Sequence, residues 1–563
     1  MIKNNNTITK ILVGAAFLII SSCQTKEKTK ENTTKKQPNI IFIMADDHTT
    51  QAVGVYQSRL AGLNPTPTID KIGNEGMIFD RCYVTNSICT PSRASILSGQ
   101  YSQANGVIDL EGVLPKEKQH LPTEIKKLGY QTAIVGKWHL HDEPAAFDYY
   151  CVFPVQGKYH NPEFRIQGPK PWPQNVIKRK GHSSDNVADL TLDWLKNKRD
   201  PNKPFLLMPQ FKAPHDDFEF AERYKDYLQD KWIPEPASMY YNGNNGSIAT
   251  RGKNDSLTRI IGSSVSRRNL VRHKGLSTWK DKNYKEFGTA QTLKEDAYQP
   301  FLHSNSEMAH TSRTYQEFMK HYLRCVKGVD DNVKRILDYL EAENLMENTV
   351  IMYTGDQGFM LGEHDYVDKR WMYEESMRTP LLVKYPKEIK AGQRSGALVN
   401  NTDFAPTILA LAGGETPDYM QGKSFASILK TNIEPENWRG ATYYRYWMHM
   451  AHRHANPAHF GIRTKDYKLI FYYGKYWVDT EKENATWNKK SWGNDFERAT
   501  PVAWEFYDMN KDPNEMNNAY NDPAYAEVIK DMKIKLKQKR VELNEGDEKY
   551  PHIQKIINEH WED

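Results

Sequence analysis

The sequence predicts an α/β fold: a large, mixed but mostly parallel sheet sandwiched by helices, with a smaller α+β domain after it. Three observations predict this. Short apolar segments stop abruptly at polar residues, amphipathic segments lie between them, and the pattern changes after about residue 430. At 563 residues, with 39% hydrophobic and 12% aromatic residues, the chain can bury a large core.

Four segments are expected to form buried strands of the large sheet. They are residues 38–44 (PNIIFIM), 130–140, 203–215 and 348–358. Continuous apolar runs of this kind are typical of strands covered on both faces. A long amphipathic helix is expected over 313–341, where apolar residues recur at steps of three and four: Tyr315, Phe318, Tyr322, Val326, Val329, Val333, Ile336 and Leu340. Strands that alternate with helices indicate crossover connections.

The rest of the chain has a different character. Residues 230–310 are rich in Asn, Gly, Ser and Arg, which is typical of a long surface excursion that shapes a binding site. Residues 459–474 predict a hairpin, 504–518 a strand followed by a turn, and 523–545 an amphipathic helix. We therefore expect a larger domain over 38–430 and a smaller one over 431–563.

The N-terminus is typical of an export signal. Lys3 and Lys10 precede an apolar run from Ile11 to Ile20, which is too short to span a bilayer. The run ends at Ser-Ser-Cys23, which resembles a bacterial lipobox, so 1–22 are expected to be a signal peptide and Cys23 a lipidated residue. Residues 23–37 would be a polar tether. We expect a lipid-anchored protein of a Gram-negative cell envelope; an ordinary secretory signal with an incidental cysteine is the alternative.

Charge and cysteine usage narrow the function. The net charge of +5 is small for this length and much of the excess lies in the first forty residues, which argues against a nucleic-acid partner. Beyond Cys23 the cysteines are Cys82, Cys89, Cys151 and Cys325. A disulfide between Cys82 and Cys89 is one possibility. Cys89 has no histidine within ten residues that could activate a thiolate, and no second cysteine at a zinc-like spacing.

Polar residues follow each expected strand, at the carboxyl ends where open α/β sheets bind their ligands. Asp46-Asp47 follow the first strand and Asp356-Gln357 follow a later one. Adjacent carboxylates repel one another, and a divalent hard cation relieves that repulsion. Because all four candidate ligands are oxygens, calcium or magnesium is favoured over zinc.

Cationic side chains follow the other expected strands. Lys137 and His139 lie in Gly-Lys-Trp-His, His215 follows Ala-Pro, and Lys369 follows a later strand. Each one alone is more often a surface lysine or a core histidine. Together with Arg93 they would supply the donors that bind and polarise a tetrahedral oxyanion such as sulfate or phosphate.

These motifs together resemble the type I, formylglycine-dependent sulfatases of the alkaline phosphatase superfamily. Cys89-Thr-Pro-Ser-Arg93, followed by Leu-Ser-Gly99, matches the family's C-x-P-x-R signature. The order Asp-Asp, C-x-P-S-R, Gly-Lys-Trp-His, Ala-Pro-His, Gly-Asp-Gln-Gly, Lys is also that of the family, over residues 38–390. The segment 505–518 is similar to the family's C-terminal domain, which would contribute to the substrate cleft. The resemblance implies an alkaline-phosphatase-like fold.

The resemblance also implies a role for each position. A maturation enzyme would oxidise Cys89 to formylglycine, whose hydrate attacks sulfur. Asp46, Asp47, Asp356 and Gln357, with the modified Cys89, would hold one calcium ion. Arg93 would orient the hydrate, Lys137 and Lys369 would bind sulfate oxygens, His139 would take a proton in the elimination step, and His215 would assist the leaving group. Gln357 departs from the asparagine of many members, which leaves the geometry of that ligand open.

Two rival functions are weighed against a sulfatase. One is hydrolysis of phosphate or phosphonate esters, which related enzymes of the same superfamily carry out. The related enzymes that use zinc bind it in histidine-rich sites. The other is glycan binding without turnover, which the aromatic, histidine-rich segment 443–454 would fit. For a sulfatase, the expected substrate is a sulfated polysaccharide or oligosaccharide. The sequence alone does not reveal which glycan it is.

Overall fold

The computed structural model describes residues 36–240, 243–253, 256–257, 261–265, 307–452, 454–479 and 496–563. Gln37–Asp563 form one compact unit. The expected signal peptide, Cys23 and nearly all of the tether lie outside the described residues, as do residues 266–306. No helix in the described part of the chain is both long and apolar enough to cross a membrane.

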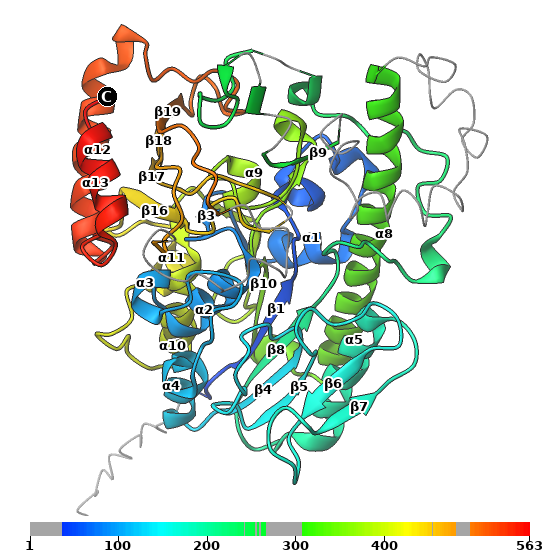
Figure 1. Ribbon diagram of the computed structural model, residues 1–563. Coiled ribbons are helices and arrows are strands. Elements are labelled where there is room, and N and C mark those ends of the chain that lie inside the picture. Colours follow the sequence, from blue (N-terminus) through cyan, green and yellow to red (C-terminus); the bar gives the residue numbers. More distant parts are fainter. Residues whose placement is uncertain are drawn as a thin grey trace, which may run out of the picture. The chain divides into compact units, whose positions relative to one another are not determined.

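A mixed sheet forms the centre of the protein (Figure 1). Among the described residues its strand order is β14-β2-β13-β10-β1-β8-β4-β5-β6-β7. The central strands β10, β1, β8, β4 and β5 are parallel, whereas β13, β6 and β7 run antiparallel to their neighbours. The bounds are β1 Asn39–Ala45, β2 Met77–Phe79, β4 Gln131–Gly136, β5 Tyr149–Val152, β6 Glu163–Ile166, β7 Val176–Lys178, β8 Phe205–Phe211, β10 Thr349–Gly355, β13 Leu381–Lys384 and β14 Gln393–Ser395.

Helices cover both faces of this sheet, because the central strands are apolar on both sides. Ile41 and Ile43 of β1 belong to one core, and Ile40, Phe42 and Met44 belong to the other. The first core is covered by α1 Pro67–Asn74, α5 Ser183–Asp193 and α8 Glu307–Ala342, and the second by α2 Cys89–Ser98, α4 His120–Lys127, α10 Phe404–Leu411 and α11 Ala426–Thr431 (Figure 1). The predicted α/β class is confirmed.

The four predicted strands are β1, β4, β8 and β10, and the predicted helix over 313–341 lies within α8. The sequence also predicts a short helix before β4 with Thr123 as its cap. The helix is present as α4, but Thr123 lies inside it and its hydroxyl donates to the Gln119 carbonyl at 3.0 Å, so Thr123 is not the cap. The excursion after residue 230 is only partly superficial, since the described Ile233, Ala249 and Ile261 are buried and β9 (Ser263–Ser264) pairs with β12 (Tyr366–Asp368).

A second, antiparallel sheet follows near the C-terminus. It consists of β16 Ala441–Tyr446, β17 His459–Thr464, β18 Tyr467–Tyr472 and β19 Ala503–Asp508, so the predicted hairpin and strand are confirmed. One face packs on α12 Ala526–Glu542 and α13 Pro551–His560 through residues such as Phe471 and Leu536. The other face packs through Tyr472 on Trp371 and Met372, which directly follow the Lys369 segment. This sheet therefore helps to position Lys369.

Candidate active site

The register of the central sheet brings the acidic residues together. β1 and β10 pair in parallel with Ala45 opposite Gly355, so Asp46 and Asp356 emerge side by side. The backbone N–H of Asp47 donates to Oδ1 of Asp356 at 3.1 Å. Carboxylate oxygens of the three aspartates lie within 4.8 Å of one another, and all three side chains are fully buried.

Three buried carboxylates at this distance repel one another. Burial raises the pKa of Asp47 to about 8. The positive charge of Lys369 opposes this rise, and the negative charges of Asp46 and Asp356 add to it. Burial, together with Asp46, likewise raises the pKa of Asp356 to about 6. Burial would also raise that of Asp46, but Lys137 and other cations hold the pKa of Asp46 well below its ordinary value.

The donor set at this point fits a hard divalent cation. Gln357 donates its amide N–H to Oδ1 of Asp47, and its Oε1 atom is buried without a hydrogen-bond partner among the described residues. Three carboxylates and one unsatisfied amide oxygen provide the all-oxygen environment that calcium or magnesium prefers.

Cys89 lies at the first position of α2, where backbone N–H groups favour negative charge. Its Sγ atom is 3.4 Å from Oδ1 of Asp46. Arg93, one turn later in α2, points to the same place and binds Oδ2 of Asp356 through Nε at 2.9 Å and the Lys137 carbonyl through Nη1 at 2.9 Å. The four described cysteines are not in disulfides, so the alternative of a Cys82–Cys89 bridge is wrong.

Two lysines contact this cluster from different strands. Lys137 follows β4 and forms a buried ion pair with Asp46. Lys369 is 2.7 Å from Oδ2 of Asp47 and 3.3 Å from Sγ of Cys89. Gly136, just before Lys137, has a φ of +105°, and a Cβ there would lie 2.0 Å from the Gln210 carbonyl, so only glycine fits this strand end.

The two predicted histidines have different surroundings. His215 Nδ1 is 2.6 Å from Oδ1 of Asp216, and its Nε2 is 3.8 Å from Oδ2 of Asp47. His139 is buried, and its Nδ1 atom has no hydrogen-bond partner in the described part of the chain. Burial lowers the pKa of His215 to about 4, despite Asp216; burial and Lys137 hold the pKa of His139 well below its usual range. The structure thus brings all ten predicted catalytic and metal positions to one place.

Sequence reasoning missed a neighbouring polar group. Arg370 forms a buried ion pair with Asp368, and its Nη2 atom lies 3.3 Å from Nδ1 of His452. Asp368 and Arg370 could have been found from the sequence, because they are the direct neighbours of Lys369 in an Asp-Lys-Arg triplet. His452 comes from the segment after β16, and no local pattern connected it to this site. Lys212, directly after β8, was also missed and is buried.

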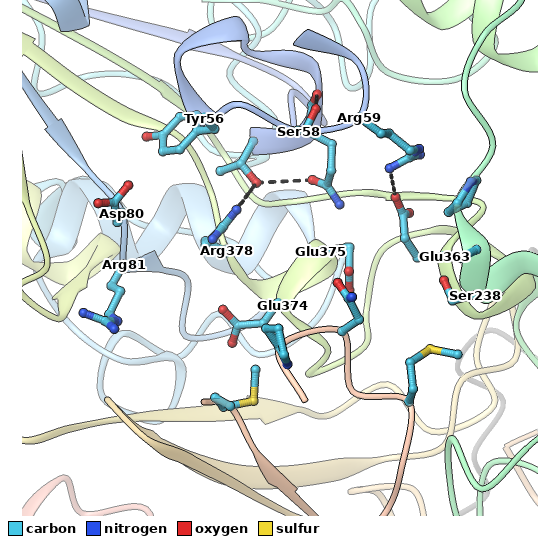
Figure 2. Close-up of a pocket in the computed structure, with 18 of the residues that line it drawn as sticks. Tyr56, Ser58, Arg59, Asp80, Arg81, Ser238, Glu363, Glu374, Glu375 and Arg378 are labelled. Carbon is cyan, nitrogen blue, oxygen red and sulfur yellow. Dashed lines mark hydrogen bonds and ion pairs between the residues drawn. The ribbon is translucent and has the colours of Figure 1, made fainter. Parts of the chain in front are cut away.

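The structure also contains a separate cavity of about 710 Å³ (Figure 2). It is lined by Thr50, Gln51, Arg59, Glu363, Glu375 and Arg378, among others, and by none of the predicted catalytic or metal residues. Arg59 pairs there with Glu363, and Arg378 donates to the Thr50 hydroxyl at 3.1 Å. The chemistry described above does not take place in this cavity.

Comparison with protein families agrees with the geometry. Residues 38–414 match the family described as Sulfatase. Residues 362–485 and 496–542 match the C-terminal region of N-sulphoglucosamine sulphohydrolase.

Individual relatives cover most of the chain. An N-acetylglucosamine-6-O-sulfatase of Bacteroides thetaiotaomicron is 38% identical over 554 residues, 96% of this chain and 92% of the relative. A sulfatase structure solved with its substrate D-glucosamine-2-N,6-O-disulfate has a TM-score of 0.75 and 36% identity, over 91% of this chain and 99% of that one. A phosphonate monoester hydrolase from Silicibacter pomeroyi, at 19% identity and a TM-score of 0.59 over 90% of this chain and 95% of that one, shares the fold alone. The chain belongs to the type I sulfatase family and is a sulfuric ester hydrolase.

Proposed function

We propose that this sulfatase removes the 6-O-sulfate from glucosamine units of a sulfated glycan, such as a glycosaminoglycan. The observation that carries the proposal is the 38% identity to an N-acetylglucosamine-6-O-sulfatase over 96% of the chain. The solved relative, whose substrate is a 6-O-sulfated glucosamine, supports the same substrate class. The sequence alone predicts a sulfated glycan without identifying its sugar, and these two relatives support glucosamine as that sugar.

Cys89 is proposed to be converted to formylglycine by a maturation enzyme, and Asp46, Asp47, Asp356 and Gln357 to hold one calcium ion beside it. When bound, the ion and the hydrated aldehyde together supply an activated hydroxyl that attacks sulfur. The thiol of Cys89 therefore stands where the nucleophilic oxygen would be. Its place at the start of α2 favours an anion there.

Lys369 and Lys137 are proposed to bind the sulfate oxygens. Lys369 already lies 3.3 Å from Sγ of Cys89, and Lys137 reaches Asp46, which Cys89 contacts. Two fixed ammonium groups stabilise the negative charge that builds on the oxygens during transfer. Arg93 acts through other groups, since it fixes the Asp356 carboxylate and the backbone of Lys137.

The histidines are proposed to move protons at opposite sides of the sulfate. Asp216 holds Nδ1 of His215, which leaves Nε2 to face the ester oxygen of the departing sugar. Burial lowers the pKa of His215 to about 4, but a bound sulfate anion favours the protonated imidazolium. Nε2 would then donate its proton to that oxygen as the bond to sulfur breaks. His139, on the strand end that carries Lys137, would accept the proton lost when sulfate is released.

The polar group formed by Asp368, Arg370 and His452 favours a sugar as the leaving group. It directly flanks Lys369, since Asp368 and Arg370 are the neighbours of Lys369 in the chain. Carboxylate, guanidinium and imidazole groups hydrogen-bond ring hydroxyls, which an aryl sulfate lacks.

We further propose that the protein works in the envelope of a Gram-negative bacterium, anchored through a lipid on Cys23. The lipobox-like sequence and the polar tether support this. An envelope location suits a polymeric sulfated substrate that cannot enter the cytoplasm.

The test is a comparison of sulfate release from N-acetylglucosamine 6-sulfate, N-acetylglucosamine 3-sulfate and galactose 6-sulfate. Release from the first alone is expected, with Cys89→Ala as the inactive control. Turnover of galactose 6-sulfate at a similar rate would contradict the assignment of the sugar. Preferential turnover of a phosphate or phosphonate monoester would support the rival hydrolase instead.

A further inference from the structure

Lys212 lies at the carboxyl end of β8, beside the catalytic cluster. β8 pairs with β1 in parallel with Phe211 opposite Ala45, and the Asp46 N–H donates to the Phe211 carbonyl at 3.2 Å. Lys212 is therefore the neighbour of Asp46 across the sheet. It also begins the turn that presents His215, whose N–H donates to the Lys212 carbonyl at 3.0 Å.

Lys212 as a whole residue is only 5% exposed, yet its ammonium group has no hydrogen bond or ion pair in the part of the chain that the structure describes. The other lysines of the site differ, since Lys137 pairs with Asp46 and Lys369 with Asp47. The Lys212 ammonium instead lies over the ring of Tyr159, 4.7 Å from its centroid. A cation–π contact only partly offsets the cost of burying a charged group.

The charges around Lys212 leave it available for an anion. Asp46, the nearest acidic residue across the sheet, is already bound by Lys137. Burial and the positive charge of Lys137 lower the pKa of Lys212, and Asp46, Asp216 and Asp217 only partly compensate. A buried lysine is rare unless it has a partner, so the missing partner is expected to arrive with the substrate.

That partner is distinct from the sulfate that is cleaved. Lys369 contacts Cys89 directly, and Lys137 is linked to it through Asp46, whereas Lys212 makes neither contact. Lys212 shares its turn with His215, which is on the side of the departing sugar. An anion that Lys212 binds is therefore carried by the sugar.

We propose that Lys212 is a specificity-determining residue that binds a second anionic group of the substrate, a sulfate on nitrogen 2 of the glucosamine whose 6-O-sulfate is removed. This inference rests on the proposed function and deepens it. Because the amino group can also be acetylated or free, the charge at nitrogen 2 decides how well a unit binds.

The experiment uses three glucosamine 6-sulfates that differ only at nitrogen 2, which is N-sulfated, N-acetylated or a free ammonium group. The substituent at nitrogen 2 is negative in the first sugar, neutral in the second and positive in the third. For the mature wild-type enzyme, kcat/KM should be highest for the N-sulfated sugar and lowest for the free ammonium form. Lys212→Met should lower kcat/KM at least about tenfold on the N-sulfated sugar, the typical worth of a charge-assisted hydrogen bond, chiefly through KM. The N-acetylated sugar should change by less than about twofold.

Lys212→Arg should keep the order of preference, and Lys203→Met should change nothing, because Lys203 is an exposed lysine just before β8. The Lys212→Met protein should also unfold at the same temperature as wild type or higher, since a buried unpaired charge is removed. A clearly lower unfolding temperature would overturn the proposal, because Lys212 would then have a partner within the chain.

Equal losses on all three sugars would also overturn it, and would assign Lys212 to the cleaved sulfate. An unchanged order of preference among the three sugars in Lys212→Met would also overturn the proposal. If the wild-type enzyme releases no sulfate from any 6-sulfate, the proposed function itself fails, which is a different result.

Discussion

The ammonium nitrogen of Lys369 lies 3.3 Å from Sγ of Cys89, and it also binds the Asp47 carboxylate. Asp356 and Gln357 directly follow β10, and the chain then returns through β11 (Met360–Leu361) and β12 to place Lys369 at the start of α2. A cation is thus fixed at the position of the nucleophile before any substrate arrives. Preorganised charge of this kind needs no rearrangement during the reaction.

Cys89→Ala should abolish sulfate release and leave the fold intact. The thiol is in no disulfide, and the side chain is small, so little packing is lost. Activity should fall below detection while the unfolding temperature changes by only a few degrees. In the active wild-type protein, mass spectrometry of the peptide containing position 89 should show a mass about 18 Da below that of the thiol form. A fully active protein with an unmodified thiol would contradict the formylglycine assignment.

Removal of the divalent cation should inactivate the enzyme and lower its unfolding temperature. Without the ion, Asp46, Asp47 and Asp356 are left as three crowded carboxylates in a buried site. Calcium should restore activity and stability better than zinc, because the ligands are oxygens. The measurement is thermal unfolding and turnover after chelation, with each metal added back. Restoration by zinc alone would favour the phosphatase-like alternative.

Much of this site could be predicted because it depends on local patterns. The continuous apolar runs of β1 and β10 marked buried parallel strands, and the polar residues after them had to meet at one edge of the sheet. The strands β2 and β13, which lie between β14 and β10, were not predicted. They have three and four residues, too few for a periodic signal.

The parts of the site that sequence reasoning missed depend on packing between distant segments. His452 meets Arg370 only because the C-terminal sheet packs on the segment after Lys369. Lys212 resembles an ordinary surface lysine in the sequence, and only the fold shows that it is buried. Burial of a charged residue is a tertiary property that neighbouring residues in the sequence do not reveal.

Glu375, in the cavity of Figure 2, should make stability depend on pH. Burial, with the nearby Glu363 and Glu515 carboxylates, raises its pKa from 4.5 to about 8. Between these values the folded protein keeps a proton that the unfolded chain loses, so the free energy of unfolding falls as pH rises from 4.5 to 8. Glu375→Gln cannot lose this proton. Its stability relative to wild type should therefore increase through this range and level off above it.

The measurement for Glu375 is urea unfolding of wild type and Glu375→Gln at several pH values. The difference between their free energies of unfolding cancels the contributions of the other titrating groups. Glu347→Gln, at an exposed position, is the matched control and should give a difference that does not vary with pH. A constant difference for Glu375→Gln would show that this carboxyl is ionised in the folded protein over the whole range.

His215 and His139 should respond differently to a change of leaving group. If His215 donates a proton to the departing sugar oxygen, His215→Ala should lose much more kcat/KM on a sugar sulfate than on an activated aryl sulfate, whose phenolate leaves without a proton. General acid catalysis is typically worth about 10²- to 10⁴-fold, so the two losses should differ by at least about tenfold. Asp216→Asn should show the same selectivity in weaker form, because Asp216 holds Nδ1 of His215.

His139→Ala is the matched comparison. His139 is proposed to act after the sugar has left, so the losses of His139→Ala should not depend on the leaving group. Equal losses on both substrates for His215→Ala would reject the acid role and make His215 a sulfate-binding donor.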